Sequence, residues 1–345
     1  MAKTIPLIRA AVLFPMIRWL KASGHSEQEW MDRVGLSSLT EDARERPVPL
    51  LKVFDLFRQL AAQEGPDACA QLISQHSLED LGVLGALILG ARTPREALTR
   101  TVHVLPRYST HEIIALKAIP GGLRLEAGWS LHLNQEIAHL TQQFTAALIY
   151  ALCHATGLPL AAPKRMNIRP HPISGIDHLR KMFGDDVASS GESVLSMELD
   201  DRILDAPLPF MAARGFDLPP SGWVMPHGKE SFSASVRLTL EALCSEPMPS
   251  LGQVAELAGM STRSLQRLLT NEGTSFRALL DESRRARTIE ALQTGRKTVH
   301  RTPGDFGFSG QSALSRAVRR WTGTSPKHLR RMELSSAAAA HDNEV

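Results

Sequence analysis

A glycine between two short helical patterns, within residues 251–272, constrains the fold of this chain more than any other feature. Gly259 can adopt the backbone turn that ends the first helix, because it has no Cβ atom. Ser261 is placed to cap the next helix. The first pattern has small or apolar residues at helical spacing, which let a second helix cross closely: Val254, Ala255 and Ala258.

The second helix of this pair is predicted over residues 262–272 and is amphipathic. Its inner face carries Leu265, Leu268 and Leu269. Its outer face carries Arg263, Gln266 and Arg267. A helix, a glycine turn and a capped helix with a basic polar face form the helix-turn-helix pattern, whose second helix enters the major groove of DNA.

A similar arrangement recurs at residues 306–321, where Ser309 is placed to cap a helix predicted over residues 310–321. Arg319 and Arg320 lie near its C-terminal end, where cations suit the helix dipole. Its buried side is expected to consist of Ala313, Leu314, Ala317, Val318 and Trp321. Its outward side is expected to consist of Gln311, Ser312, Ser315 and Arg316.

Residues 276–294 are predicted to form one helix that connects the two units and ends at Gly295. The second unit also needs a supporting helix before Phe308, and Pro303 and Gly304 disfavour a helix interior by about 3 and 1 kcal/mol. Pro303 is tolerated at the first position of a helix. We therefore expect a short supporting helix that begins near Pro303.

The charge is unevenly distributed along the chain. Residues 231–335 carry 16 lysines and arginines against 9 aspartates and glutamates, a net charge of +7. The remaining residues carry 23 against 27, a net charge of −4. A basic segment attached to an acidic one predicts a polyanionic partner for the basic segment, although a solvated basic surface gives the same count.

The upstream residues mix helical patterns with a few short strands. A Pro120-Gly121-Gly122 turn joins two strand patterns and predicts a β-hairpin over residues 111–129. Helices are predicted over residues 81–91, 96–105 and 134–156. Trp19 and Trp129 are candidates to line a pocket, with structural packing as the alternative.

We therefore predict a mainly α fold with a small α+β component. The expected parts are an N-terminal α+β domain of residues 1–212, a linker of residues 213–230, an all-α domain of residues 231–334 with two helix-turn-helix units, and a disordered tail of residues 335–345. Three scattered cysteines indicate no disulfide framework: Cys69, Cys153 and Cys244. With no signal peptide or membrane-length apolar run, a cytoplasmic location is expected.

Two short motifs resemble the DNA-binding domain of the AraC/XylS family over about residues 231–331. The first is Gly259-Met260-Ser261-x-x-Ser264-Leu265-x-Arg267. The second is Gly307-Phe308-Ser309-x-Gln311-Ser312-Ala313-Leu314-Ser315-Arg316-Ala317, followed by Arg320-Trp321-Thr322-Gly323-x-Ser325-Pro326. Upstream, three further motifs resemble the N-terminal domain that is named arabinose-binding in this family. They are Leu81-Gly82-x-x-Gly85, Thr93-Pro94-x-Glu96-Ala97-Leu98 and Leu204-Asp205-x-Pro207-Leu208-Pro209.

The resemblance implies a sequence-specific transcription regulator whose recognition helices, 262–272 and 310–321, enter successive major grooves of double-stranded DNA. Arginine and glutamine can read guanine and adenine through paired hydrogen bonds. The residues expected to read bases are Arg263, Gln266, Arg267, Gln311, Ser312, Ser315 and Arg316. The residues expected to contact the DNA backbone are Ser261, Thr262, Ser309, Arg319, Arg320 and Lys327.

The resemblance also implies partners. We expect a homodimer, an unidentified small-molecule effector bound by the N-terminal domain, and contact with RNA polymerase. No membrane association, cofactor or catalytic residue is expected, because no phosphate loop or nucleophile motif is present. The alternative is a ligand sensor or enzyme-like domain whose C-terminal part no longer binds DNA specifically.

His132, Glu136 and His139 would share one helix face if their helix began early enough, and such a face can bind zinc. The alternative is that His132 precedes the helix, with the other two at the surface or in a ligand pocket.

Overall fold

The structure of the chain is a computed structural model, which describes residues 4–37, 39–159, 162–209, 225, 231–243, 248–293, 308 and 310–328. The chain divides into two compact units, residues 6–227 and residues 228–345 together with 1–5. Nearly all of the predicted linker and the whole predicted tail lie outside the described residues. The limits of the domains therefore stay a prediction.

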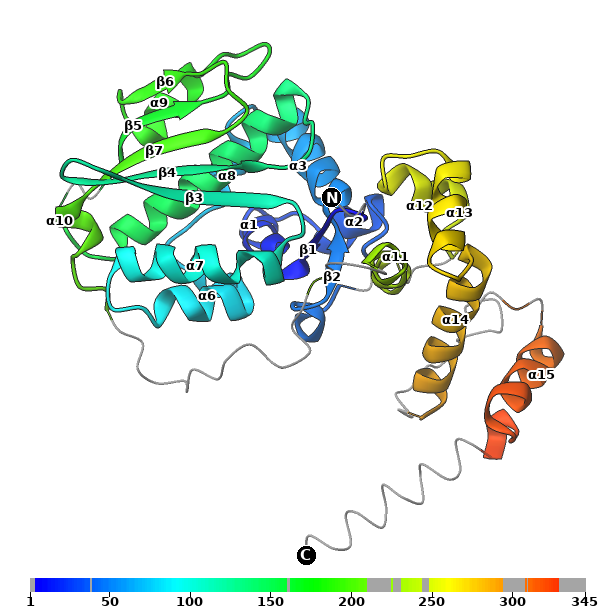
Figure 1. Cartoon of the computed structure of the whole chain (residues 1–345). Helices are drawn as coiled ribbons and strands as arrows, with labels where there is room; N and C mark the ends of the chain where they lie inside the picture. Colours follow the sequence, from blue (N-terminus) through cyan, green and yellow to red (C-terminus); the bar gives the residue numbers. More distant parts are fainter. Residues whose placement is uncertain are drawn as a thin grey trace, which may run out of the picture. The chain divides into compact units, whose positions relative to one another are not determined.

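The first unit contains a five-stranded sheet, in the order β3-β4-β7-β5-β6 (Figure 1). β5 and β6 are parallel, and the other neighbouring strands are antiparallel. The strands are β3 Glu112–Ile119, β4 Gly122–Trp129, β5 Lys164–Ile168, β6 Val187–Ser189 and β7 Leu195–Asp200. A separate antiparallel pair consists of β1 Leu7–Arg9 and β2 Pro47–Pro49.

The predicted hairpin is confirmed as β3 and β4, with Gly121 in the turn at a φ of +76°. Only a residue without a Cβ atom adopts such a φ readily. The register places Glu112 directly opposite Trp129. Because side chains alternate between the two faces of a strand, Glu112 and Ile114 lie on the same face of β3.

Helices pack against this sheet, and the three predicted helices are present. α7 is capped by Thr93, whose hydroxyl accepts a hydrogen bond from the Glu96 amide at 3.3 Å. The Asn134 side chain caps α8 by accepting from the Ile137 amide at 2.8 Å. The helices are η1 Ala10–Leu13, α1 Phe14–Ala22, α2 Glu27–Arg33, η2 Glu41–Ala43, α3 Leu50–Glu64, α4 Ala68–Gln71, α5 Ser77–Asp80, α6 Gly82–Leu89, α7 Pro94–Tyr108, α8 Gln135–His154, α9 Asp177–Phe183 and α10 Asp201–Leu204.

α8 is the central helix of the first unit and contacts β4, β5 and β7 of the sheet (Figure 1). It also packs against α3, where the rings of Phe57 and Phe144 lie 5.0 Å apart. The core of the unit therefore lies between the sheet, α8 and the helices that precede the hairpin. None of the described helices is long and apolar enough to span a membrane.

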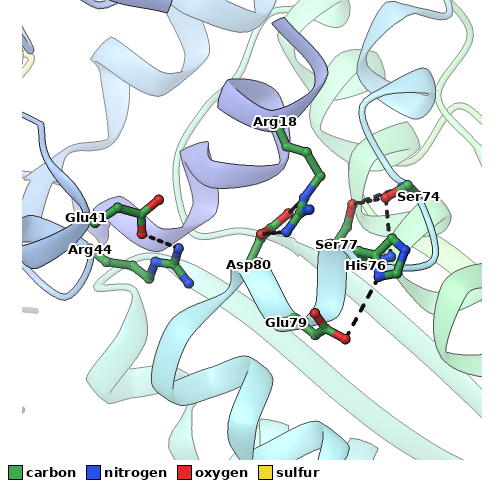
Figure 2. A network of polar contacts seen from close by, with 8 residues as sticks. All are labelled: Arg18, Glu41, Arg44, Ser74, His76, Ser77, Glu79 and Asp80. Carbon is green, nitrogen blue, oxygen red and sulfur yellow. Dashed lines mark hydrogen bonds and ion pairs between the residues drawn. The ribbon is translucent and has the colours of Figure 1, made fainter. Parts of the chain in front are cut away.

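A buried carboxylate connects the short helix α5 to α1 (Figure 2). The Arg18 guanidinium donates two hydrogen bonds to Asp80, with Nε to Oδ2 at 2.7 Å. The Asp80 side chain is only 6% exposed, so it depends on this partner. In the preceding turn, the Ser77 hydroxyl accepts from the Ser74 amide at 2.9 Å (Figure 2). These contacts fix α5 against the domain.

The second unit consists of helices in its described part, so the predicted fold class is confirmed. Ile5 belongs to this unit, and its amide donates to the buried Ser235 hydroxyl at 3.0 Å. The helices are α11 Ser231–Ala242, α12 Leu251–Leu257, α13 Thr262–Asn271, α14 Phe276–Gln293 and α15 Gln311–Thr322.

Candidate functional site

The first helix-turn-helix unit consists of α12 and α13. Ser250 and Gln253 form a reciprocal capping box at the start of α12. Gly259 takes a φ of +60° in the turn, and the Ser261 hydroxyl accepts from the Ser264 amide at 3.2 Å. The predicted roles of Gly259 and Ser261 are therefore confirmed.

The faces of α13 are arranged as predicted. Leu265 and Leu269 are completely buried, and Leu268 is half-buried. The outward residues are all exposed: Ser261, Thr262, Arg263, Gln266 and Arg267. The helix ends at Asn271, one residue earlier than predicted, and Glu272 occupies the C-cap position. The prediction that Glu272 belongs to the helix is therefore wrong by one residue.

Glu272 has a structural role that the sequence did not reveal. Its carboxylate accepts hydrogen bonds from the amides of Phe232, at 3.2 Å, and Ser233, at 2.8 Å. These amides lie in the first turn of α11, where helical N–H groups lack partners within the helix. A negative charge at a helix N-terminus is also favoured by the helix dipole. Glu272 therefore ties the end of α13 to α11.

Replacing Glu272 by alanine is expected to lower the free energy of unfolding of the second unit by about 1–2 kcal/mol, because two amides lose their acceptor. Urea unfolding of the full chain, followed by hydrogen exchange at residues 231–235, measures this loss. Glu256→Ala is the matched control, since Glu256 is exposed on α12. Equal effects of the two substitutions would contradict the capping role.

The helix of the second unit, α15, begins differently from the prediction. Its N-cap residue is Gly310, and no side chain caps it. The prediction that Ser309 caps this helix is therefore wrong in position, and Ser309 itself lies outside the described residues. The Gly310 carbonyl instead accepts from the amides of Ala313 and Leu314, at 3.0 and 3.1 Å.

The apolar side of α15 is confirmed. Leu314, Ala317 and Val318 are buried, whereas Ala313 and Trp321 are half-buried. Phe308 packs against Leu314 and Val318 with its ring 6.0 Å from that of Trp321. Ser315, expected to face outward, is half-buried. The exposed residues predicted to contact DNA are Gln311, Ser312, Arg316, Arg319, Arg320 and Lys327.

The connecting helix α14 has 18 described residues. At 1.5 Å per residue this length is about 27 Å, most of the roughly 34 Å between successive major-groove turns. α14 contacts both α11 and α15, and the Arg285 side chain donates to the Trp321 carbonyl at 3.5 Å. Pro303, Gly304 and the rest of residues 294–307 lie outside the described residues, so the short supporting helix stays a prediction.

A second candidate site is a cavity of about 90 Å³ inside the first unit. Of its 23 lining residues, 18 are Ile, Val, Leu, Phe or Trp. Trp129 lines this cavity, which agrees with the pocket-lining alternative for that residue. Trp19 is not among the lining residues, and its ring stacks on that of His25 with the centroids 5.8 Å apart. Among the described residues, the one acidic side chain that lines it is that of Glu112, a residue that no sequence signal identified.

The three residues considered for zinc do not share a site. α8 begins at Gln135, so His132 precedes the helix. His139 is completely buried, and its Nδ1 donates to the Arg169 carbonyl at 2.7 Å. Burial lowers the pKa of His139 to about 4, so this side chain is neutral and its Nε2 accepts from His178 at 3.0 Å. The described residues contain no group of three side chains arranged to hold a metal ion.

Comparison with known proteins bears on both units. Residues 254–332 match a family described as "Helix-turn-helix domain". Residues 24–208, more than half of the chain, match "Arabinose-binding domain of AraC transcription regulator, N-term". The chain belongs to the AraC family of transcription regulators. It is a DNA-binding helix-turn-helix regulator with an N-terminal domain of the arabinose-binding type, and the resemblance noted in the sequence is confirmed.

Individual proteins are similar to this AraC-family regulator over different lengths. The "Uncharacterized HTH-type transcriptional regulator Mb1430" of Mycobacterium bovis is 26% identical over 265 residues, which are 75% of this chain and 76% of that protein. The "HTH-type transcriptional regulator VqsM" of Pseudomonas aeruginosa is 32% identical over 95 residues, 28% of this chain and 29% of that protein. The crystal structure of the transcriptional regulator CdpR from Pseudomonas aeruginosa covers 92% of this chain and 96% of its own, with 18% identity and a TM-score of 0.39.

Proposed function

We propose that this regulator recognises specific DNA sequences by inserting α13 and α15 into successive major grooves. The observation that carries this proposal is the charge of the two exposed helix faces. α13 and α15 together contain five arginines and no aspartate or glutamate: Arg263, Arg267, Arg316, Arg319 and Arg320. Such faces suit a polyanion, and arginine forms paired hydrogen bonds with guanine.

The side chains are proposed to divide their roles by position. Residues in the first turns of α13 and α15 read base edges: Arg263, Gln266, Arg267, Gln311, Ser312, Ser315 and Arg316. Residues at the helix ends and in the adjacent turns contact phosphates: Ser261, Thr262, Ser309, Arg319, Arg320 and Lys327. A phosphate contact fixes the protein on the duplex, whereas a base contact gives specificity.

The affinity of the full chain for duplex DNA is expected to fall steeply with salt. If three to six cations neutralise phosphates, the slope of log K against log salt is about −3 to −5. A salt titration by fluorescence anisotropy, between about 50 and 300 mM NaCl, measures this slope. Lys327→Ala is expected to reduce the slope by about 1. An affinity that does not change with salt would exclude the proposal.

Three further properties are part of this proposal. The regulator forms a homodimer, responds to a small molecule bound within residues 6–209, and contacts RNA polymerase in the cytoplasm. The mainly apolar cavity and the family description of the N-terminal domain support the small molecule. An effector must bind one conformational state more tightly than another to change DNA binding. Light scattering of the full chain tests the dimer, and a monomer at high concentration, with and without DNA, excludes it.

A further inference from the structure

The cavity of the first unit lies among the elements that form its core. Its wall includes side chains from α3, α5, α6, α7, α8 and the β3–β4 hairpin. Aromatic rings define one part of it, where Phe54 and Trp129 meet edge to face with centroids 5.2 Å apart. Leu78 of α5 and Leu81, which precedes α6, also line the cavity, and they flank the anchored Asp80 in the sequence. The cavity is therefore a space between fixed elements.

The threonines that line the cavity already use their hydroxyl protons. Thr101 donates to the Ala97 carbonyl at 2.9 Å, Thr141 to the Ile137 carbonyl at 2.9 Å, and Thr145 to the Thr141 carbonyl at 3.1 Å. Each bond runs one helical turn back along the same helix. These hydroxyls therefore have no proton left to donate to a ligand, and they offer only acceptor capacity.

Glu112 differs from the other lining residues. It is half-buried, it borders the cavity, and among the described residues none donates a hydrogen bond to its carboxyl group. A carboxylate in apolar surroundings is unfavourable unless a donor reaches it. The side chain thus supplies one strong acceptor in a mainly apolar wall, whose other polar side chains are three threonines and Tyr108. The complementary ligand has an apolar body and a donor at one end.

We propose that the cavity binds a small, mainly hydrocarbon molecule, up to about the size of one ring, whose single hydrogen-bond donor contacts Glu112. The inference rests on the proposed function in one respect, because it takes this molecule to be the effector of DNA binding. The size follows from the volume of about 90 Å³. For comparison, a dry protein cavity of about 150 Å³ lined by Leu, Ile and Phe holds benzene.

A sugar does not suit this cavity, in spite of the arabinose-binding name of the domain family. A pentose carries four hydroxyl groups, and each needs partners when it leaves water. Here 18 of the 23 lining residues are Ile, Val, Leu, Phe or Trp, and the three threonine protons are already used. A molecule with several hydroxyls would therefore leave most of them without partners.

Pyrrole and furan test the inference, because both are five-membered rings and only pyrrole carries an N–H donor. At pH 8, where the carboxyl is ionised, we expect pyrrole to bind the full chain at least tenfold more tightly than furan, since furan brings no donor to the carboxylate. Chemical shifts of leucine and isoleucine methyl groups, followed by NMR, report binding at the lining residues. L-arabinose is expected to shift none of these signals and to displace no pyrrole.

Glu112→Leu is expected to bring the affinities for pyrrole and furan to within about threefold of each other. Glu112→Gln keeps the shape of the side chain and a weaker acceptor, so it should reduce the preference for pyrrole over furan without abolishing it. This variant provides the test if Glu112→Leu does not fold. Glu29→Gln, which removes an exposed carboxyl on α2, is the matched control and should keep the full preference. Equal binding of the two rings by the native chain, an unchanged preference in both Glu112 variants, or binding of arabinose at the cavity would overturn the inference.

The effector role is measured separately, as the change in DNA affinity when pyrrole is present at saturation. A change of at least threefold in the native chain, absent in Glu112→Leu, supports it. Binding of pyrrole with no change in DNA affinity overturns the effector role and leaves the ligand class of the cavity standing. Loss of DNA binding under all conditions contradicts the proposed DNA recognition, and the methyl shifts still decide the cavity.

Discussion

Replacing Arg263 by alanine is expected to weaken binding to the preferred DNA site by about 1–3 kcal/mol, roughly five- to 150-fold. Binding to random duplex DNA should remain nearly unchanged. Arg263 is the second residue of α13 and is exposed. The first turns of a recognition helix reach base edges in the major groove, where an arginine can bond guanine O6 and N7 together. The preferred site is first selected from a random duplex pool, and dissociation constants are then measured at one salt concentration.

Lys327→Ala is the matched control for this experiment, because it also removes one exposed cation from the second unit. A phosphate contact is independent of sequence, so this variant should lose the same factor on the selected site and on random DNA. The core of α13 is formed by Leu265 and Leu269, and neither substitution touches it. If Arg263→Ala lost as much affinity on random DNA as on the selected site, its role in base reading would be wrong.

The first helix-turn-helix unit was predictable from sequence because its signals are local. Gly259 takes a backbone conformation that other residues avoid, and Ser261 caps a helix that starts at the next residue. The spacing of Leu265 and Leu269 determines which side of α13 is buried. Each of these signals acts within one or two helical turns, so it can be read without the tertiary fold. The β3–β4 hairpin was predictable for the same reason.

Contacts between distant residues could not be predicted in this way. Glu272 bonds to amides about 40 positions earlier in the chain, and nothing in the sequence near Glu272 indicates that partner. The start of α15 was misplaced by a single residue because Ser309 is a good capping residue, yet the helix begins after Gly310. Strands β5, β6 and β7 are three to six residues long and have no hairpin turn between them, so they gave no clear pattern.

The cavity shows the same limit at the level of function. Its lining residues come from Ile8 to Leu152 and would each be assigned to an ordinary core. In the sequence, Glu112 resembles a charged residue at the start of a strand. The position of its carboxyl at an apolar cavity results from the strand register, which places Glu112 opposite Trp129, and from the helices that line the same cavity. A chemical role for this carboxyl therefore becomes visible only in three dimensions.

The Glu112 carboxyl should also make the stability of the first unit depend on pH. Burial raises its pKa from the usual 4.5 to about 7. Below pH 4.5 the group is neutral in the folded and the unfolded chain, and its pKa shift costs no stability. Between pH 4.5 and 7 the unfolded chain releases the proton while the folded chain retains it. The cost therefore grows through this range and is complete above pH 7.

Glu112→Gln cannot ionise, and it is expected to gain stability relative to the native chain as the pH rises. At about 1.36 kcal/mol per pH unit, the interval from 4.5 to about 7 corresponds to a relative gain of about 3 kcal/mol between pH 4 and pH 8. Urea unfolding of both proteins at a series of pH values measures it. Glu112→Leu should show the same trend with pH, because it also lacks the carboxyl, although its absolute stability will differ through packing. A donor ligand in the cavity should stabilise the ionised carboxylate and so reduce the gain. A difference between native chain and Glu112→Gln that stays constant from pH 4 to pH 8 would show that water or a protein donor reaches this carboxyl in solution.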